Sequence, residues 1–128
     1  MKIAEVSDRY SLSADTLRYY ERIGLIPPVN RNDNGIRDYD ETDVRRVEFI
    51  KCMRSAGLPI ETLIEYVGLV QQGDTTIEAR KQILKAQREL ILARMKAMQE
   101  TLDVLNYKIS VYEDALLKKE RAIILADE

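Results

Sequence analysis

The sequence predicts a mostly α-helical protein, in which a winged helix-turn-helix domain is followed by a long dimerisation helix that forms a coiled coil. Three observations predict this fold class. Two short helical segments near the N-terminus are joined by a brief connection, as in a helix-turn-helix. An Asn-Gly turn then lies between two arginine-bearing segments, and apolar residues recur at intervals of seven through the second half of the chain.

The composition narrows the classes of protein to which this chain could belong. Its 128 residues carry 20 Lys and Arg against 22 Asp and Glu, with one cysteine and no histidine. The lack of histidine removes the most common general base, and one thiol supports neither an intrachain disulfide nor a structural zinc site. The apolar runs are too short for a membrane span or a signal peptide. We expect a cytoplasmic, non-enzymatic protein without cofactor or metal.

The first helix pair is expected at the N-terminus. The apolar residues within 2–9 are spaced as they would be on one face of a helix. Ser13 is placed to cap a second helix at residues 14–23, because its hydroxyl can accept hydrogen bonds from the free amides of the first turn. Gly24 is suited to end that helix, and two prolines shortly after it prevent continuation. The pair therefore has the form of a helix-turn-helix.

Residues 29–39, VNRNDNGIRDY, predict a small hairpin that would form the wing. Asn and Gly tolerate the positive φ angles of tight hairpin turns. Each presumed strand carries one arginine, Arg31 or Arg37. Such a short, exposed and basic hairpin buries little apolar surface, so a purely structural role explains it poorly.

A second helix pair is expected at residues 41–56 and 59–72, which completes an N-terminal domain of residues 1–72. Asp40 is placed to cap the first helix of this pair. Pro59 lies at the start of the second helix, where a missing backbone amide costs nothing.

A long coiled-coil helix is expected over residues 73–118, with a short tail at 119–128. Thr75 and Glu78 match a capping box at its start. A helix of about forty residues rises roughly 60 Å, too far for the small N-terminal domain to cover its apolar stripe. We expect a second copy to cover the stripe, and the alternative is that the helix folds back on its own domain. The expected dimer interface comprises Leu84, Ile91, Met95, Met98, Leu102, Leu105, Ile109, Tyr112 and Leu116.

The helix expected at residues 14–23 carries two adjacent tyrosines between two arginines. Arg18 and Arg22 are four residues apart and therefore share a face. Arginine can bind guanine edges or phosphate oxygens in a major groove, and tyrosine hydroxyls can donate to phosphates. The alternative is a solvated surface with two half-buried tyrosines. A basic wing beside the helix would supply a second grip on duplex DNA, which favours DNA binding over that alternative.

The segments TLRYYERIGLIPP and NRNDNGIRDYDETDVRRVEFIKCMRSAGLPIE resemble the N-terminal domain of the MerR family of bacterial transcription regulators, over residues 1 to about 72. The resemblance implies that the long helices pair antiparallel and that the homodimer binds a palindromic promoter operator. It also implies that the dimer kinks and untwists the DNA so that RNA polymerase can use the promoter. Ile36 departs from the family, which often has an aromatic residue there. The matching residues include Arg18, Tyr19, Tyr20, Glu21, Gly24, Leu25, Pro28, Gly35, Arg37, Tyr39, Ile50 and Gly57.

We expect double-stranded DNA, a second copy of the chain and RNA polymerase as partners, and no membrane. The alternative class is a coiled-coil adaptor whose N-terminal domain binds another protein. The salt dependence of binding distinguishes the two classes. Binding to DNA releases phosphate counterions, so its affinity falls steeply as the salt concentration rises. The expected DNA-contacting residues are Lys2, Ser13, Thr16, Arg18, Tyr19, Tyr20, Arg22, Arg31, Arg37 and Tyr39.

Cys52 is the only thiol in the sequence and the candidate sensor. Lys51 and Arg45 are near it along the expected helix, and nearby cations favour the reactive thiolate, whereas Glu48 opposes this effect. The alternative is a packed, unreactive cysteine, with a different inducer for the protein. The segment IKCMRSAG is similar to the NmlR/AdhR branch of the family, which implies a response to reactive aldehydes, nitrosative agents or other electrophiles. Metal sensors of the family carry a cysteine at the start of the long helix. The long helix expected here begins without one, so the resemblance does not imply metal sensing.

Overall fold

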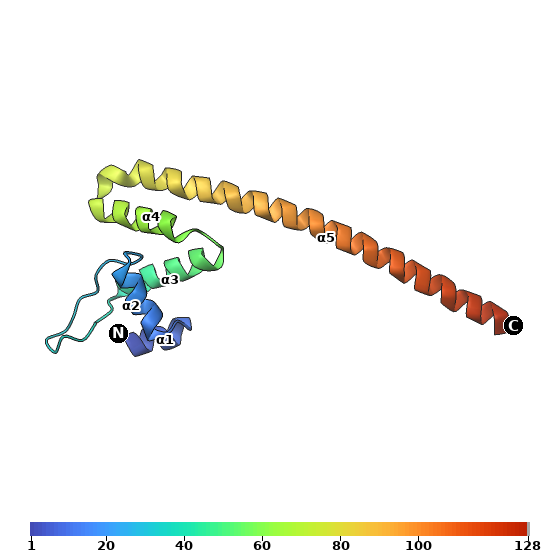
Figure 1. Cartoon of the computed structure of the whole chain (residues 1–128), viewed down its shortest axis with the longest axis horizontal. Helices are drawn as coiled ribbons and strands as arrows, with labels where there is room; N and C mark the ends of the chain where they lie inside the picture. The colour runs from blue at the N-terminus through green and yellow to red at the C-terminus, as the bar shows by residue number, and fades with distance from the viewer. Residues whose placement is uncertain (128) are drawn as a thin grey trace. The chain divides into compact units, whose positions relative to one another are not determined.

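The computed structural model describes residues 1–127 and is mostly helical (Figure 1). The chain divides into two compact units, Met1–Gln87 and Arg88–Glu128, and each is described by itself. We call the first the N-terminal unit. The elements are α1 (Ile3–Tyr10), α2 (Ala14–Arg22), α3 (Glu41–Ser55), α4 (Ile60–Gln72), the 3₁₀-helix η1 (Asp74–Thr76) and α5 (Ile77–Asp127).

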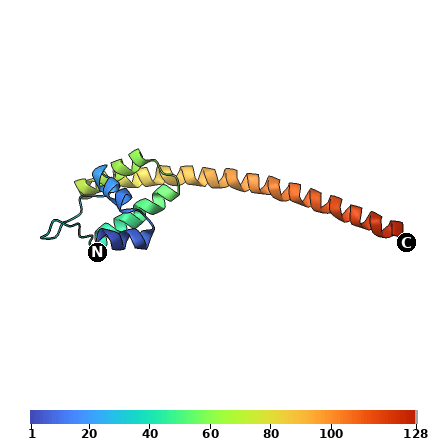
Figure 2. The same ribbon diagram turned by 60° about the horizontal axis from the view of Figure 1, so that its bottom comes forward.

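The first three helices form the core of the N-terminal unit. Helix α1 contacts both α2 and α3, and the three lie together in both views (Figures 1 and 2). Val6 of α1, Leu17 of α2 and Val47 of α3 are completely buried. Burial of an aliphatic side chain of this size contributes roughly 1.5–3 kcal/mol to stability. This core holds one side of α2 inward and leaves its other side exposed.

The boundaries of α2 follow the local sequence signals. Ser13 caps the helix, and its Oγ accepts a hydrogen bond from the Thr16 N–H at 3.0 Å. Gly24 follows the helix with φ +84°, a conformation that is strained for residues with a Cβ. The next residue, Leu25, donates from its N–H to the Tyr20 carbonyl at 2.9 Å and is completely buried. The segment that follows α2 is therefore anchored in the core.

The wing between α2 and α3 extends away from the helices (Figures 1 and 2). Its pairing is shorter than expected, because a single antiparallel bridge between Arg31 and Arg37 replaces the two predicted strands. The Asn32 side chain organises the tip, where its Oδ1 accepts from the N–H groups of Asn34 at 2.9 Å and Ile36 at 3.0 Å. The Asn32 side chain thus accepts the hydrogen bonds of two backbone N–H groups that longer strand pairing would otherwise satisfy.

Helix α3 begins with a reciprocal cap. The Asp40 side chain accepts from the Asp43 N–H at 2.8 Å, and the Asp43 side chain accepts from the Asp40 N–H at 3.0 Å. At the other end of α3, Arg54 Nη1 donates to the Leu58 carbonyl at 2.7 Å and closes the turn into α4. Leu63 of α4 is almost fully buried, so α4 contributes to the same N-terminal core.

A buried threonine organises the junction between α4 and α5. Thr76 donates to the carbonyls of Leu69 at 2.6 Å and Gly73 at 2.8 Å, and Arg80 Nε donates to Thr76 Oγ1 at 3.1 Å. The expected capping box at Thr75 and Glu78 is therefore replaced by a 3₁₀ turn built around the neighbouring threonine.

Helix α5 has 51 residues and is longer than expected. It continues to Asp127, through most of the segment expected as a tail at 119–128, because neither glycine nor proline follows Gly73 in the sequence. Residue 128 lies outside the described part of the chain. Within residues 1–127, no helix is both long enough and apolar enough to cross a membrane.

Candidate nucleic-acid interface

Helix α2 presents a polar, basic side to solvent. Arg18, Tyr19 and Arg22 are exposed, whereas Leu17 lies in the core on the opposite side. The guanidinium of Arg22 stands over the Tyr19 ring, 5.3 Å from its centroid. This cation–π contact keeps both side chains on the same exposed surface. The expected pairing of arginine and tyrosine on one accessible side of the helix is thus present.

Arg18 pairs with a neighbour on its own helix. Its Nη1 donates to Asp15 Oδ1 at 2.8 Å, and the two side chains are 48% and 94% exposed. An ion pair this exposed contributes little to stability, below about 1 kcal/mol. The arginine can therefore exchange this carboxylate for a phosphate oxygen or a base edge at small cost.

Arg37 has a more constrained position than expected. Its Nε donates to Glu21 Oε1 at 2.9 Å, and the side chains are only 20% and 16% exposed. Arg37 belongs to the wing and Glu21 to α2, so the pair ties the wing to α2. From the sequence, Arg37 was expected to contact DNA, and nothing local indicated that Glu21 would be its partner.

Arg31 is the exposed arginine of the wing. Its Nη1 donates to the Gly35 carbonyl at 2.8 Å across the turn. Ile36 next to that turn is 46% exposed and supplies an aliphatic surface. The wing thus offers one accessible cation, and its second arginine holds the wing against α2.

Two tyrosines expected at the DNA surface lie in the core instead. Tyr20 is 9% exposed and Tyr39 is 1% exposed. The reason for Tyr20 is its spacing, since it follows Leu17 by three residues and so shares the buried side of α2. That spacing was visible in the sequence and could have placed the ring correctly.

The hydroxyl of Tyr39 is buried and has no hydrogen-bond partner within residues 1–127. Burial raises its pKa above the ordinary value of 10.0, and the charge of Arg37 partly opposes this increase. Glu21 also influences this pKa, so the hydroxyl lies near the ion pair that joins the wing to α2. The Tyr39 ring is therefore packed in the core near the Arg37–Glu21 pair and is not accessible to a ligand.

The N-terminal residue also supports the base of the wing. The Tyr39 N–H donates to the Met1 carbonyl at 2.7 Å, and the Met1 ammonium donates to the Tyr39 carbonyl, also at 2.7 Å. The same ammonium lies 3.2 Å from Asp38 Oδ1. Lys2 follows directly and is exposed. No local sequence pattern predicts this pairing, since its partners are about forty residues apart.

Ser13 and Thr16 stand at the first turn of α2. Their side-chain oxygens are 2.8 Å apart, and Ser13 also caps the helix. The backbone amides of this turn and the exposed Ser13 form a weakly positive end that suits a phosphate oxygen. Both residues are therefore placed where a DNA backbone could approach α2.

Cys52 lies on α3 and its side chain is exposed in the single chain. The two cations that the sequence placed near it have other partners. Lys51 donates to the Tyr10 carbonyl, and Arg45 pairs with Glu41 at 2.5 Å. The exposure of the thiol does not support the packed, unreactive alternative, and these two residues do not supply the expected cationic environment. Within residues 1–127, no group of three or more His, Cys, Asp or Glu is arranged to hold a metal ion.

The geometry of a capped helix, a tied wing and a second helix pair agrees with comparisons to known proteins. The profile of the MerR HTH family of regulatory proteins matches residues 1–70, and the MerR DNA-binding profile matches residues 44–107. This chain belongs to the MerR family. It is accordingly a DNA-binding transcription regulator and not an enzyme. The predicted fold class, a helix-turn-helix domain followed by a long helix, is confirmed.

Individual relatives place the chain within the MerR family. It is 61% identical over 92 residues to the HTH-type transcriptional regulator AdhR of Bacillus subtilis, an alignment that covers 72% of this chain and 66% of AdhR. A MerR family structure from Listeria monocytogenes has 46% identity and a TM-score of 0.91, and it covers 96% of this chain and 93% of its own. HiNmlR, a MerR family regulator lacking the sensor domain, was solved bound to promoter DNA. It has 27% identity and a TM-score of 0.79, with 89% and 90% of the two chains covered. The predicted resemblance to the NmlR/AdhR branch is confirmed.

Proposed function

We propose that this MerR family regulator binds a palindromic promoter operator as an antiparallel homodimer and activates transcription by distorting the DNA. The observation that carries the proposal is an uncovered apolar stripe on α5. Eight of the nine expected interface residues are exposed in the single chain, from 37% for Leu84 to 71% for Met98, and Ile91 is half-buried. A second copy would remove this surface from water. We call these nine residues the seam.

The spacing of the seam suits antiparallel pairing. The seam residues are spaced symmetrically about residue 100. When two copies of the helix pair antiparallel about that point, each seam residue except Tyr112 faces a seam residue of the other copy. In this register Arg88 faces the Tyr112 ring, which a cation–π contact favours. A shift by one heptad would instead place Arg88 against Lys119, and like charges repel. The opposed pairs are Leu84 with Leu116, Ile91 with Ile109, Met95 with Leu105, and Met98 with Leu102.

The DNA contacts follow from the exposed residues of the N-terminal unit. Arg18 and Arg22 on α2 would enter a major groove, and Arg31 on the wing would reach the adjacent backbone. A two-fold dimer presents two such surfaces, which matches a palindrome of two half-sites. Two separated grips can bend and untwist the DNA between them, and RNA polymerase would then use the realigned promoter. The DNA-bound structure of the related HiNmlR supports this proposal.

The proposed signal is an electrophile that reacts with Cys52. Its exposure on α3 and the resemblance to the NmlR/AdhR branch support this role. With an aldehyde, the thiolate sulfur would bond to the carbonyl carbon, the C=O π pair would move to oxygen, and that oxygen would take a proton to give a hemithioacetal. The added group would change the exposed surface of α3 and bias the arrangement of the two N-terminal units. The alternative is that Cys52 has no sensing role and that another inducer acts.

Selection of bound duplexes from a random pool, followed by footprinting, tests the proposal. We expect a palindrome with two protected half-sites and altered cleavage at its centre after aldehyde treatment. Affinity should fall steeply with salt, because phosphate counterions are released on binding. A single half-site, or binding only to protein partners, would favour the adaptor function instead.

A further inference from the structure

The junction between α4 and α5 is held by three residues, Gly73, Thr76 and Arg80, which we call the junction cluster. Gly73 has φ +94° and ψ −167°, a backbone conformation that is almost confined to glycine. Its carbonyl accepts from the Thr76 N–H at 3.1 Å, the Thr76 hydroxyl at 2.8 Å and Arg80 Nη2 at 3.0 Å. Arg80 Nε also donates to Thr76 Oγ1 at 3.1 Å. Two nitrogens of one guanidinium thus hold the same turn.

The C-terminal end of α4 takes its cation from outside its own sequence. The last carbonyls of a helix are unpaired within that helix and carry a partial negative charge. The last turn of α4, residues 69–72, contains neither lysine nor arginine. Arg80 lies in the first turn of α5 and is half-buried, and its guanidinium reaches the Gly73 carbonyl at this end of α4. This side chain therefore joins the end of α4 to the start of α5.

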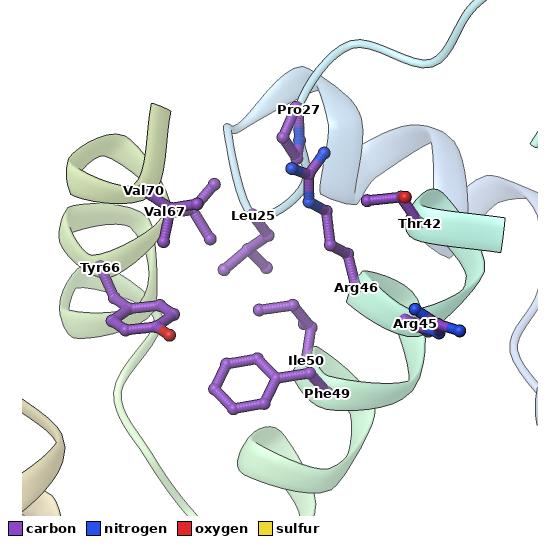
Figure 3. A pocket seen from close by; sticks show the side chains of 10 residues that line it. All are labelled: Leu25, Pro27, Thr42, Arg45, Arg46, Phe49, Ile50, Tyr66, Val67 and Val70. Carbon is purple, nitrogen blue, oxygen red and sulfur yellow. The ribbon is translucent and has the colours of Figure 1, made fainter. Parts of the chain in front are cut away.

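Helix α4 is in turn held against the segment that follows α2. A Cβ built on Gly24 would lie 3.9 Å from Ile64 Cγ2 of α4, an ordinary van der Waals distance. Helix α4 also packs on α3, where the Tyr66 and Phe49 rings lie 5.6 Å apart. The two rings line an apolar pocket of about 210 Å³ between α3, α4 and the segment that follows α2 (Figure 3). The position of α4 therefore follows that of α2, and the junction cluster transmits it to the start of α5.

Small changes at this junction would have large effects at the DNA. At about 1.5 Å per residue, the part of α5 from Ile77 to residue 100, the centre of the seam, is about 35 Å long. A tilt of about 5° over that length displaces an N-terminal unit by roughly 3 Å, close to the ~3.4 Å rise of one base pair. A dimer that accepts only one separation of half-sites therefore needs a rigid junction.

We propose that Arg80, acting through Thr76 and Gly73, sets the spacing between the two operator half-sites that this regulator accepts. The inference rests on the proposed homodimer. Arg80 touches no DNA in this role and is a positioning residue for the contacts that α2 and the wing make. The exposed arginines of α2 and the wing determine how strongly one half-site is bound, and Arg80 determines how far apart two half-sites can be.

Binding of the full-length chain to duplexes of graded spacing tests the proposal. The selected palindrome is shortened or lengthened at its centre by one and two base pairs, and a duplex with one half-site is included. The parent chain should lose at least tenfold in affinity when the centre changes by two base pairs. In Arg80→Ala that loss should shrink to about threefold or less, while affinity for one half-site stays within about twofold. Lys85→Ala is the matched control, because it removes an exposed cation from the same part of α5 and should keep the parent preference.

Two substitutions at Thr76 provide a second test in which the size of the side chain is nearly constant. Thr76→Val removes the hydroxyl that donates to the carbonyls of Leu69 and Gly73, so it should broaden the spacing preference as Arg80→Ala does. Thr76→Ser keeps a hydroxyl and should retain the parent preference.

Three outcomes would contradict the role of Arg80. An Arg80→Ala variant that keeps the spacing preference of the parent overturns this inference and leaves the proposed dimer intact. An equal loss of affinity for every duplex, the single half-site included, also overturns it, since that result shows a purely structural role. A parent chain that binds all spacings equally overturns the proposed two-fold grip, and this inference with it.

Discussion

Arg37 in the wing donates from Nε to Glu21 Oε1 in α2 at 2.9 Å, and both side chains are mostly buried. The pair joins two elements that are sixteen residues apart in sequence. Because both partners are shielded from water, the interaction is worth more than a surface ion pair. It fixes the angle between α2 and the wing, on which the proposed two-point grip on DNA depends.

Glu21→Ala should therefore lower the free energy of unfolding by about 1.5–3 kcal/mol, because it leaves the Arg37 guanidinium without its partner. Operator affinity should fall as well, since the wing is no longer held against α2. Urea denaturation and binding titrations measure the two effects. Asp15→Ala is the control, because it removes an exposed pair and should change stability by less than about 1 kcal/mol. Equal stability losses in both variants would contradict the role assigned to Glu21.

Tyr39→Phe removes a buried hydroxyl that has no partner within residues 1–127. An unsatisfied buried polar group costs about 1–3 kcal/mol, so the variant should be at least as stable as the parent chain. Its operator affinity should be unchanged, because the ring is 1% exposed. A clear loss of affinity in a well-folded variant would restore the expected DNA contact for Tyr39.

Asp43 gives the chain a pH dependence of stability with a defined sign. Burial raises its pKa above the ordinary value of 3.8, and the hydrogen bond from the Asp40 N–H partly opposes the increase. The folded state thus binds the proton more tightly than the unfolded state, so this group destabilises the fold as pH rises through that window. Asp43→Asn keeps an acceptor for Asp40 and removes the charge. It should be more stable than the parent at pH 7, and the difference should shrink toward pH 4. A constant difference across this range would show that the charge is not responsible.

Cys52→Ser should retain operator affinity within about twofold and lose aldehyde-induced transcription. The serine hydroxyl is nearly the same size as the thiol but does not react with electrophiles at neutral pH. Transcription in vitro from the selected operator, with and without aldehyde, measures the response. Undiminished induction in the variant would assign the signal to another group.

The sequence predicted those parts of the fold that depend on local signals. Ser13 caps α2, Gly24 ends it, and Asp40 caps α3, because each acts on residues within one turn of itself. The contacts that were missed join distant segments. The Arg37–Glu21 pair and the bond from Lys51 to the Tyr10 carbonyl span 16 and 41 residues. Only the packed fold brings such partners together, and their pairing changed the expected roles of the cations.

The length of α5 and the burial of Tyr20 could both have been predicted better. No glycine or proline follows Gly73, so nothing in the sequence ends the helix before the last residues described. The three-residue spacing from Leu17 to Tyr20 indicated a buried side of α2. Tyr39 gave no comparable signal, because its burial depends on pairing with Met1 at the base of the wing.

The central claim is that two chains pair through the seam and bind one operator with their two N-terminal units. Sedimentation of the full-length chain with a palindromic duplex tests this claim most directly. The account predicts two chains per duplex. It also predicts that Leu102→Asp weakens dimerisation at least tenfold, whereas Val104→Asp, outside the seam, does not. A chain that stays monomeric at micromolar concentration and binds the duplex singly, or a Leu102→Asp variant that dimerises normally, would contradict it.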